Sequence, residues 1–397
     1  MNAASSEAAR ANRAEATLSP LPLERFSLDG FLASSARLWR DRLAMRDTCS
    51  SPLAGFTCSE LDAEVGRMAG VLAHLGLIAG ERILVCGGIG LSVIVACLAA
   101  LRAGLDVGLA LPAFTTEEIA DAARRIRAAA ILGNATPPTT VAAETLLAAT
   151  AQAPCVRLLC TSGGMIDGAA ALDAAAWAHE ELAVLAPNPS AGAVITFTNG
   201  AGGIEPVFHR QATLIAAALD VARRAKIGAN STVLSTIAPV TFAGLVAGPI
   251  GALLSGAPLH LHTSFAAAAF LDALDDSAPA HLVVPASIAC DLAGAGLATP
   301  AYLASLLLLR RIRSEQSRLP GQPLDGAVPI LDLYALGERA AVAEQRRQGA
   351  GLAPLAREPH LVLVDATRIL AFEMREASGK LEIRGAGVTD GEDWSVP

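Results

Sequence analysis

A threonine and three glycines stand close together between Thr196 and Arg210, in the stretch TFTNGAGGIEPVFHR. The stretch starts within an apolar run, residues 193–197, that is typical of a buried strand. After a strand, the backbone N–H groups of a glycine loop can converge on phosphate oxygens, because glycine allows a close approach. A plain tight turn explains the glycines equally well. Glu205 stands near the place where a phosphate loop needs a lysine, and a carboxylate there opposes phosphate binding.

Histidines and arginines elsewhere have simpler explanations. His260 and His262 are two residues apart on a predicted strand, so they share a face and could hold a metal ion. No third ligand is evident, and ordinary packing is the favoured interpretation. His209 follows the glycine loop, where a role at a helix start explains it as well as chemistry does. The apolar run 306–309 predicts a buried strand that leads into a solvated loop. We expect this loop, and not an anion site, to carry Arg310, Arg311 and Arg313.

A second glycine-rich stretch, ILVCGGIG at residues 83–90, supports a rival hypothesis. With Asp106 as the acid that binds a ribose, it would be the turn of a dinucleotide-binding enzyme. However, Val93 occupies the third glycine position, and a complete capped helix precedes the turn. The sequence therefore disfavours a nicotinamide enzyme.

The composition is that of a globular protein with a large core. Of the 397 residues, 53% are hydrophobic and 17% are charged, which excludes a disordered chain. The net charge is −8 and no block of Lys or Arg stands out, so we expect no nucleic-acid partner. The seven cysteines contain no CxxC pair and no zinc spacing, and we expect reduced thiols in a cytoplasmic protein.

Neither an export signal nor a membrane span is expected. Residues 1–20 contain no apolar core and predict a disordered tail. Residues 83–101 lack charge over a spanning length, but Gly87, Gly88 and Gly90 interrupt them. A buried strand, a glycine turn and a buried helix explain this segment better.

Periodic apolar positions predict alternating helices and strands over most of the chain. Thr57 with Glu60, and Thr115 with Glu118, have the spacing of capping boxes at helix starts. The alternation favours an α/β fold with mainly parallel sheets. The predicted helices are 61–75, 92–102, 115–126, 214–225, 244–254 and 266–274, and the strands 83–86, 129–132, 232–237, 258–262 and 281–284. Near the end, the predicted strands 360–365, 369–376 and 380–384, the last two joined by a turn at 377–379, indicate a small, barrel-like antiparallel subdomain.

Five stretches, taken in order, carry a resemblance to a known family. They are FTCSELDAEVGRMAGVLAHLGLIAGERILVCGG, LAALRAGLDVGLALPAFTTEEI, TNGAGGIEPVFHR, DLYALGE and GKLEIRGAGV. The set resembles the adenylate-forming superfamily of acyl-CoA synthetases, firefly luciferases and peptide-synthetase adenylation domains. The third resembles its loop TSGTTGxPKGV, the fourth its motif Asn-x-Tyr-Gly-x-Thr-Glu, and the fifth its segment Gly-Glu-Leu-x-x-Arg-Gly. The resemblance runs from about residue 26 to the end of the chain.

The resemblance implies a nucleotide site with few charged contacts. Thr198, Gly200 and Gly203 match the phosphate loop, whereas Asn199, Ala201 and Gly202 replace hydroxyl residues and Glu205-Pro206 replaces Pro-Lys. In the later motif Tyr334 and Glu338 are kept, and Gly337 replaces a threonine. The family uses the tyrosine near adenine and the glutamate for magnesium, so ATP, Mg and CoA are the implied cofactors. The sequence given ends just before the family's Thr-Gly-Asp motif, and we expect the small C-terminal domain, with its catalytic lysine, to be absent.

We therefore predict a degenerate large domain of the adenylate-forming fold. Its predicted parts are a tail, two α/β subdomains and a β subdomain, at residues 1–25, 26–190, 191–355 and 356–397. Losing one donor to the transition state typically lowers the rate about 10²–10³-fold, so several losses predict a pseudoenzyme. It would bind an acyl-type small molecule or a protein partner. The alternatives are an acyl-CoA or acyl-adenylate ligase completed by a partner chain, and a purely structural interaction protein. Catalytic residues are left unassigned.

Overall fold

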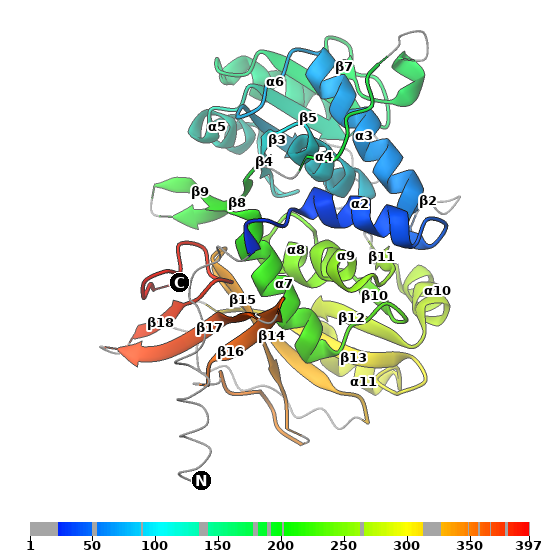
Figure 1. The fold of residues 1–397 in the computed structure, drawn as a ribbon, viewed down its shortest axis with the longest axis vertical. Helices are drawn as coiled ribbons and strands as arrows, with labels where there is room; N and C mark the ends of the chain where they lie inside the picture. The colour runs from blue at the N-terminus through cyan, green and yellow to red at the C-terminus, as the bar shows by residue number, and fades with distance from the viewer. Residues whose placement is uncertain are drawn as a thin grey trace.

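The chain folds into two α/β halves with a small sheet beside them (Figure 1). The computed structural model describes residues 23–396, except 50–53, 89, 135–141, 178–181, 189–191, 201, 263–265, 313–326, 348, 356–357, 366 and 378–379. The predicted tail therefore lies almost wholly outside the described residues, as does most of the predicted turn at 377–379.

The first sheet, in the upper half of Figure 1, has seven strands in the order β7-β6-β5-β3-β4-β8-β9. All its neighbouring pairs are parallel except the last, β8 with β9. Its strands are β3 (Arg82–Cys86), β4 (Asp106–Leu109), β5 (Ala130–Asn134), β6 (Leu158–Ser162), β7 (Ala170–Ala171), β8 (Val194–Gly200) and β9 (Gly203–His209). The helices of this half are α3 (Cys58–His74), α4 (Leu91–Arg102), α5 (Thr116–Ile126), α6 (Ala143–Gln152) and the short η2 (Ala174–Trp177).

The second sheet has eight strands in the order β15-β14-β13-β12-β10-β11-β1-β2, parallel inside and antiparallel at both edges. Its strands are β1 (Leu43–Asp47), β2 (Ala54–Thr57), β10 (Thr232–Ser235), β11 (Leu259–Leu261), β12 (Ala280–Pro285), β13 (Leu303–Ile312), β14 (Ile330–Leu336) and β15 (Ala340–Gln345). The helices around it are α2 (Leu28–Leu38), α7 (Gln211–Ala225), α8 (Phe242–Leu245), α9 (Gly251–Ser255), α10 (Ala267–Ser277), η4 (Ala286–Ile288) and α11 (Ala289–Gly294). A π-helical turn, η3 (Val246–Ile250), joins α8 to α9.

The last strands form an open three-stranded antiparallel sheet, β16 (His360–Val364), β17 (Thr367–Ala377) and β18 (Lys380–Arg384). The predicted antiparallel pairing is confirmed. The predicted barrel-like closure is not seen among the described strands, because β16 and β18 are the two edges of the sheet.

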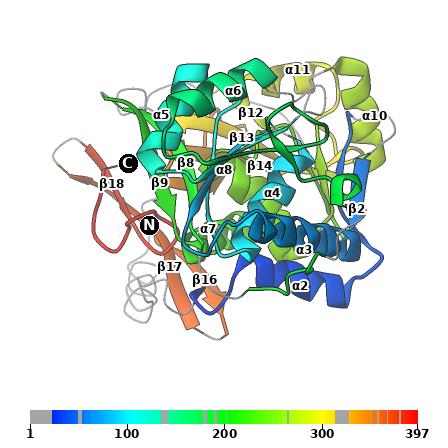
Figure 2. The same cartoon turned by 90° about the horizontal axis from the view of Figure 1, so that it is seen from above.

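Three apolar clusters show how the layers stack. The largest fills the space between the two sheets and includes residues of α2, α3, α4, α7, α8 and α9. A second lies on the far side of the first sheet under α5 and α6, and a third on the far side of the second sheet under α10 and α11. Figure 2, seen from above, shows the helices stacked over the sheet strands. The mixed α/β fold with mainly parallel sheets is therefore confirmed.

The second sheet is assembled from two separate parts of the chain. The first sheet consists of the consecutive strands β3 to β9. β1 and β2 precede these strands in sequence, yet β1 pairs with β11 in the second sheet. The polypeptide therefore crosses between the halves twice, once before β3 and once after β9.

Several local predictions meet a direct test. Both capping boxes are present, with Thr57 and Thr115 accepting hydrogen bonds from the backbones of Glu60 and Glu118. The predicted single helix 244–254 is wrong in detail, because Pro249 lacks an N–H group and Gly248 departs from helical geometry. No helix in the described part of the chain is long and apolar enough to cross a membrane.

Asp106 cannot serve a dinucleotide turn at residues 83–90. It begins β4, opposite Arg82 at the amino end of β3, whereas the glycines follow the carboxyl end of β3. Its carboxylate accepts the Ala193 N–H at 2.8 Å and faces Arg82 at 3.3 Å. The rival hypothesis therefore fails, since the acid lies at the opposite end of the sheet from the glycine turn.

Candidate functional site

The predicted glycine loop is a tight antiparallel hairpin. β8 continues through Thr198 to Gly200, and Gly203 opens β9 with φ +96°. Successive peptide groups of an extended strand point to alternate sides, so they do not converge on one phosphate as those of a wrapped loop do. The expectation of a loop is wrong here, because strand pairing extends to Gly200 opposite Gly203.

The Glu205 carboxylate covers one face of this hairpin. Thr198 and Glu205 are direct cross-strand partners, so their side chains lie on the same face. A Cβ atom added to Gly200 would lie 2.1 Å from Glu205 Oε1, which shows that the carboxylate rests against the glycine. The hairpin face that the resemblance assigns to phosphate therefore holds a negative charge of the chain itself.

Arg125 of α5 fixes the hairpin tip from the side. Its guanidinium donates to the Gly202 carbonyl at 2.8 Å and to Asp121 at 2.7 Å. Because Asp121 is already its ion-pair partner, Arg125 does not supply the uncompensated positive charge of the missing loop lysine.

Glu338 reaches the base of the hairpin. It follows Gly337, which has φ +57°, at the end of β14. Its carboxylate accepts the Phe242 N–H at 2.6 Å, at the start of α8, and a hydrogen bond from Thr196 on β8. Burial raises the pKa of Glu338, and the hydrogen bonds and the charge of Arg311 only partly oppose it. Glu338 is therefore a half-buried carboxylate that joins β14, α8 and β8, not a solvated one.

A row of polar side chains continues from Glu338 to the C-terminal segment. Thr196 Oγ1 lies 2.8 Å from His209 Nε2, and His209 Nδ1 lies 2.7 Å from Thr389 Oγ1. Burial lowers the pKa of His209 to about 3, so the ring is neutral and one nitrogen donates while the other accepts. The hydroxyl of Thr196 donates to Glu338, so it accepts from Nε2, and Thr389 donates to Nδ1.

His209 is thus a buried connector and not a helix-start residue. It is the last residue of β9, and its ring meets Phe242 edge-on at 5.0 Å between centroids. The sequence contains no local indication of this role, because Thr389 lies 180 residues further along the chain.

Tyr334 borders a large cavity at the carboxyl ends of β12, β13 and β14. The cavity has a volume of about 720 Å³, and its walls include Leu309, Arg310, Arg311, Ile312, Tyr334 and Leu355. The Tyr334 hydroxyl donates to the Ala353 carbonyl, and burial raises its pKa. The ring is therefore held in place at the cavity wall.

An ion-pair network lies next to Tyr334. Asp332 accepts from Arg346 at 2.7 Å, from Arg310 at 2.9 Å and from the Ala353 N–H at 2.9 Å. Burial alone would raise the pKa of Asp332, but the hydrogen bonds from Arg346, Ala353 and Arg310 hold it below its usual value. Arg310 and Arg311 belong to β13, so the prediction that they lie on a solvated loop is wrong.

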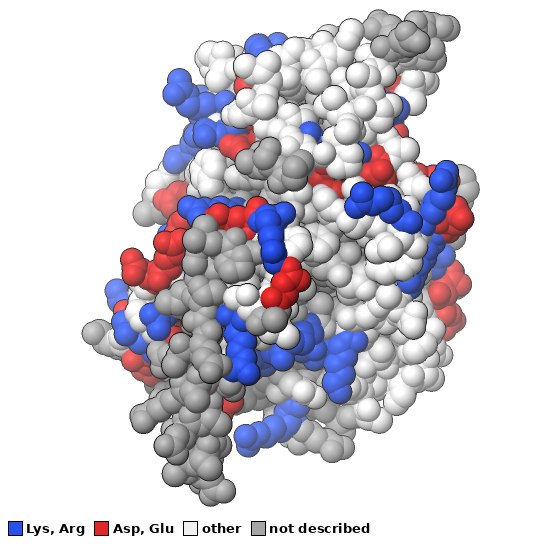
Figure 3. All heavy atoms as spheres, viewed as in Figure 1, with Lys and Arg blue, Asp and Glu red and all other residues white. Residues whose placement is uncertain are grey.

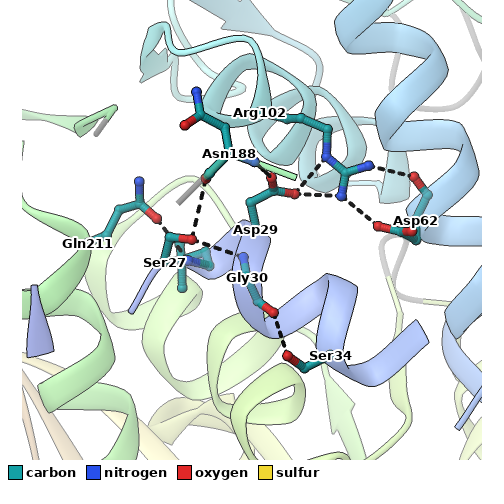
Figure 4. A network of polar contacts seen from close by, with 9 residues as sticks. Ser27, Asp29, Gly30, Ser34, Asp62, Arg102, Asn188 and Gln211 are labelled. Atoms are coloured by element: carbon teal, nitrogen blue, oxygen red, sulfur yellow. Dashed lines mark hydrogen bonds and ion pairs between the residues drawn. The ribbon is translucent and has the colours of Figure 1, made fainter. Parts of the chain in front are cut away.

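A third network of polar contacts holds α2 against α3 and α4 (Figure 4). Arg102 of α4 is almost fully buried and donates to Asp29 of α2 at 2.8 Å and to Asp62 of α3 at 2.6 Å. Asp29 also accepts the Asn188 N–H at 2.8 Å. These partners lie far apart in sequence. The sequence indicates such a network only through Arg102, a single arginine in an otherwise apolar helix.

The predicted site residues lie in three places. Thr198 and Gly200 lie two and four residues beyond Thr196 along β8, on the face that reaches Glu338. Tyr334 lies apart from them at the cavity, and Gly203 lies at the hairpin tip near Arg125. The resemblance implies magnesium triphosphate beside Thr198 and Glu338. The residues present do not fit it well, because the Glu205 carboxylate covers the hairpin face and Glu338 is already hydrogen-bonded.

The two histidines proposed as metal ligands, His260 and His262, pack against neighbouring hydroxyl groups. His260 lies 2.6 Å from Ser277 Oγ, and His262 lies 2.9 Å from Thr48 Oγ1, so each contacts its own neighbours. No group of three or more potential metal ligands occurs among the described residues. On the face shown in Figure 3, acidic and basic atoms are interspersed across the middle of the molecule, with a smaller group of basic atoms below.

Comparison with known proteins places these features in a family. The family model described as AMP-binding enzyme matches residues 32–391. A salicyl-AMP ligase / salicyl-S-ArCP synthetase of Mycobacterium tuberculosis is 37% identical over 94 residues, which are 23% of this chain and only 17% of that protein.

Solved structures share the fold at low sequence identity. The apo structure of Mycobacterium smegmatis MbtA matches with a TM-score of 0.67 and 21% identity, covering 97% of this chain and 70% of that one. A benzoate CoA ligase from Burkholderia xenovorans matches with a TM-score of 0.70 and 18% identity, covering 91% and 72%. With the family model spanning most of the chain, this protein belongs to the AMP-binding, adenylate-forming enzyme family.

Proposed function

We propose that this protein binds an acyl-type small molecule, or a partner protein, and does not activate carboxylates with ATP at ordinary enzyme rates. The position of Glu205 carries the proposal. Its carboxylate rests on Gly200, on the hairpin face that the family resemblance assigns to phosphate. A carboxylate about 6 Å from a phosphate oxygen repels it by roughly 3 kcal/mol per charge at an effective dielectric constant near 20. Salt and solvent reduce this value at an exposed side chain.

The first experiment is calorimetric titration of the full chain with magnesium-ATP, combined with ATP–pyrophosphate exchange. Salicylate and benzoate, the acids named for the relatives, are suitable first carboxylates. We expect no heat at millimolar nucleotide and no carboxylate-dependent exchange. Exchange at ordinary enzyme rates contradicts the proposal.

Charge reversal at the hairpin tests the physical reason. Glu205→Lys replaces a repelling carboxylate by the kind of charge that phosphate loops use, so magnesium-ATP should bind at least tenfold more tightly. Glu358→Lys makes the same change at an exposed residue before β16 and serves as the control. Equal nucleotide affinity of the wild type and Glu205→Lys would show that Glu205 is not the cause.

One observation favours the alternative, an acyl-adenylate or acyl-CoA ligase completed by another chain. Glu338, the implied magnesium ligand, is retained and lies beside Thr196 at the base of the hairpin. On this alternative Glu338→Ala abolishes a magnesium-dependent activity in any reconstituted system. If Glu338→Ala retains the magnesium-dependent activity, the alternative is wrong.

A further inference from the structure

A cysteine and a histidine meet where two neighbouring strands of the second sheet end. Thr48 and Cys49 follow β1, and His262 follows β11. β1 and β11 are parallel neighbours, with Asp47 opposite Leu261, so the residues that follow the two strands lie side by side. The Thr48 N–H donates to the Leu261 carbonyl at 2.9 Å and holds the two ends together. These residues do not belong to the lining of the 720 Å³ cavity.

The Cys49 thiol lies within hydrogen-bond distance of the imidazole. Its Sγ is 3.4 Å from His262 Nδ1. Thr48 Oγ1 also lies 2.9 Å from this nitrogen, but the Thr48 hydroxyl has a second acceptor, the Leu261 carbonyl at 3.0 Å. Because the hydroxyl proton can go to that carbonyl, Nδ1 is left to accept the proton of the thiol.

His262 is a buried ring in the protonation state that a base requires. It is 3% exposed, and its ring meets Phe270 edge-on with the centroids 5.5 Å apart. Burial lowers the pKa of His262, and the negative charge of Asp47 only partly opposes this. The ring is therefore neutral at pH 7, with one nitrogen that carries no proton. Asp47 also accepts the Cys49 N–H at 2.8 Å, which places a carboxylate near the imidazolium that forms when the thiol gives up its proton.

Four of the other cysteines differ from Cys49 in burial or in the partner of the thiol. Burial raises the pKa of three thiols to about 12, so they stay protonated at neutral pH: Cys86, Cys97 and Cys160. Cys155 is exposed, but its thiol donates to the Ala123 carbonyl at 3.6 Å, and a carbonyl oxygen opposes the loss of the thiol proton. Cys49 is partly exposed and therefore accessible to a small molecule.

We propose that Cys49 is a modification site, at which the thiol forms a mixed disulfide with a small-molecule disulfide while His262 acts as the base. His262 Nδ1 takes the thiol proton, and Sγ attacks one sulfur of the disulfide. A new S–S bond to Cys49 forms, the S–S bond of the small molecule breaks, and its second half leaves as a thiolate that takes the proton from His262. Cys49 is oxidised and the leaving half is reduced to a thiol, so the exchange needs no further reactant. This inference does not depend on the proposed function.

Oxidised glutathione is the probe that tests the proposal. The full chain is treated at pH 7 and at pH 10, and the modification of each cysteine is followed by mass spectrometry of its peptide. At pH 7 we expect Cys49 to react at least tenfold faster than Cys155, and His262→Gln to remove that advantage. At pH 10 an ordinary thiol, with a pKa of about 8.5, ionises without a base. There His262→Gln should change the Cys49 rate less than about twofold.

His281→Gln is the matched control, because His281 is also a buried histidine but contacts Ser305 Oγ, at 2.8 Å, and not a thiol. It should leave the Cys49 rate unchanged at both pH values. A variant that unfolds exposes the buried Cys86 to the reagent, and His262→Asn then takes the place of His262→Gln. Equal rates of Cys49 and Cys155 at pH 7, an unchanged Cys49 rate in the His262 variant, or the same loss at pH 7 and pH 10 overturns the proposal.

Discussion

At the scale of single residues, the Asp332 carboxylate forms ion pairs with two arginines next to the cavity. It is fully buried and neutralises Arg346, which is almost as buried, together with Arg310. Asp332→Ala leaves the Arg346 charge without its partner inside the protein, and such a loss costs about 3–5 kcal/mol. We expect the free energy of unfolding in urea to fall by that amount. Asp332→Asn keeps the shape and an acceptor, so its effect should be smaller.

Asp276→Ala is the control for this prediction. Asp276 pairs with Arg46 at 3.4 Å, but its side chain is 59% exposed, so we expect a loss of at most about 1 kcal/mol. Equal losses for Asp276→Ala and Asp332→Ala would show that the Asp332 network does not stabilise the fold through burial.

The same residues show which part of the site the sequence could predict. Thr198, Gly200, Tyr334 and Glu338 were named from the order of local motifs, and their role in binding stays a prediction. Their partners could not be predicted, since hydrogen bonds such as that of His209 with Thr389 join residues 180 positions apart. Arg311 was misplaced for a related reason, because the length of β13 depends on its pairing with β14.

At the scale of elements, close packing of α3 depends on Gly70. A Cβ atom there would lie 2.0 Å from the carbonyl oxygen of Ala183, in the segment that crosses the helix. Alanine has the better helix propensity, by about 1 kcal/mol, but backbone must move to accommodate it, and overpacking of this kind costs about 1–3 kcal/mol. We expect Gly70→Ala to lower the free energy of unfolding.

Gly294→Ala, at the end of α11, is the control. Its new methyl group meets nothing within 4 Å, so the substitution should be neutral or slightly stabilising. A Gly70→Ala variant at least as stable as the wild type would contradict this packing argument.

Elements with local signals were predicted well, and those decided by packing were not. The capping boxes at Thr57 and Thr115 begin α3 and α5 as predicted. The glycines between Gly200 and Gly203 predicted a loop, but pairing of β8 with β9 continues to the tip. Capping is a matter of four successive residues, whereas hairpin pairing here depends also on Phe197 and Ile204 packing under α5.

At the scale of the whole molecule, a buried charge cluster joins the small sheet to the second α/β half. His360 of β16 places Nδ1 at 2.9 Å from Asp220 of α7 and Nε2 at 3.1 Å from Glu344 of β15. Arg224 lies 3.2 Å from Asp220 and 3.5 Å from Glu344, and Arg223 lies 3.8 Å from Asp220. Because both ring nitrogens face carboxylates, both hydrogen bonds require the doubly protonated imidazolium.

This geometry gives stability a defined dependence on pH. Burial alone would lower the pKa of His360, but hydrogen bonds to Asp220 and Glu344 overcome it and raise the pKa. The folded state thus binds a proton more tightly than the unfolded state. The contribution to stability is complete below the ordinary histidine pKa of about 6.5 and is lost as pH rises through the raised value. The slope in that window is at most about −1.4 kcal/mol per pH unit.

The other buried histidines contribute in a different range of pH. Burial lowers the pKa of His209, His260 and His281, so they destabilise the fold only as pH falls below their ordinary value. Urea unfolding measured between pH 6.5 and about pH 8 therefore reports on His360. The buried thiols of Cys86, Cys97 and Cys160, whose pKa burial raises, add their own downward slope only above about pH 8.5. His360→Gln should remove the downward slope, whereas His74→Gln, at an exposed position on α3, should keep it. An unchanged slope in His360→Gln would mean that the cluster does not hold the small sheet by protonation, and that apolar contacts such as Phe372 against the His360 ring, with centroids 5.9 Å apart, are sufficient.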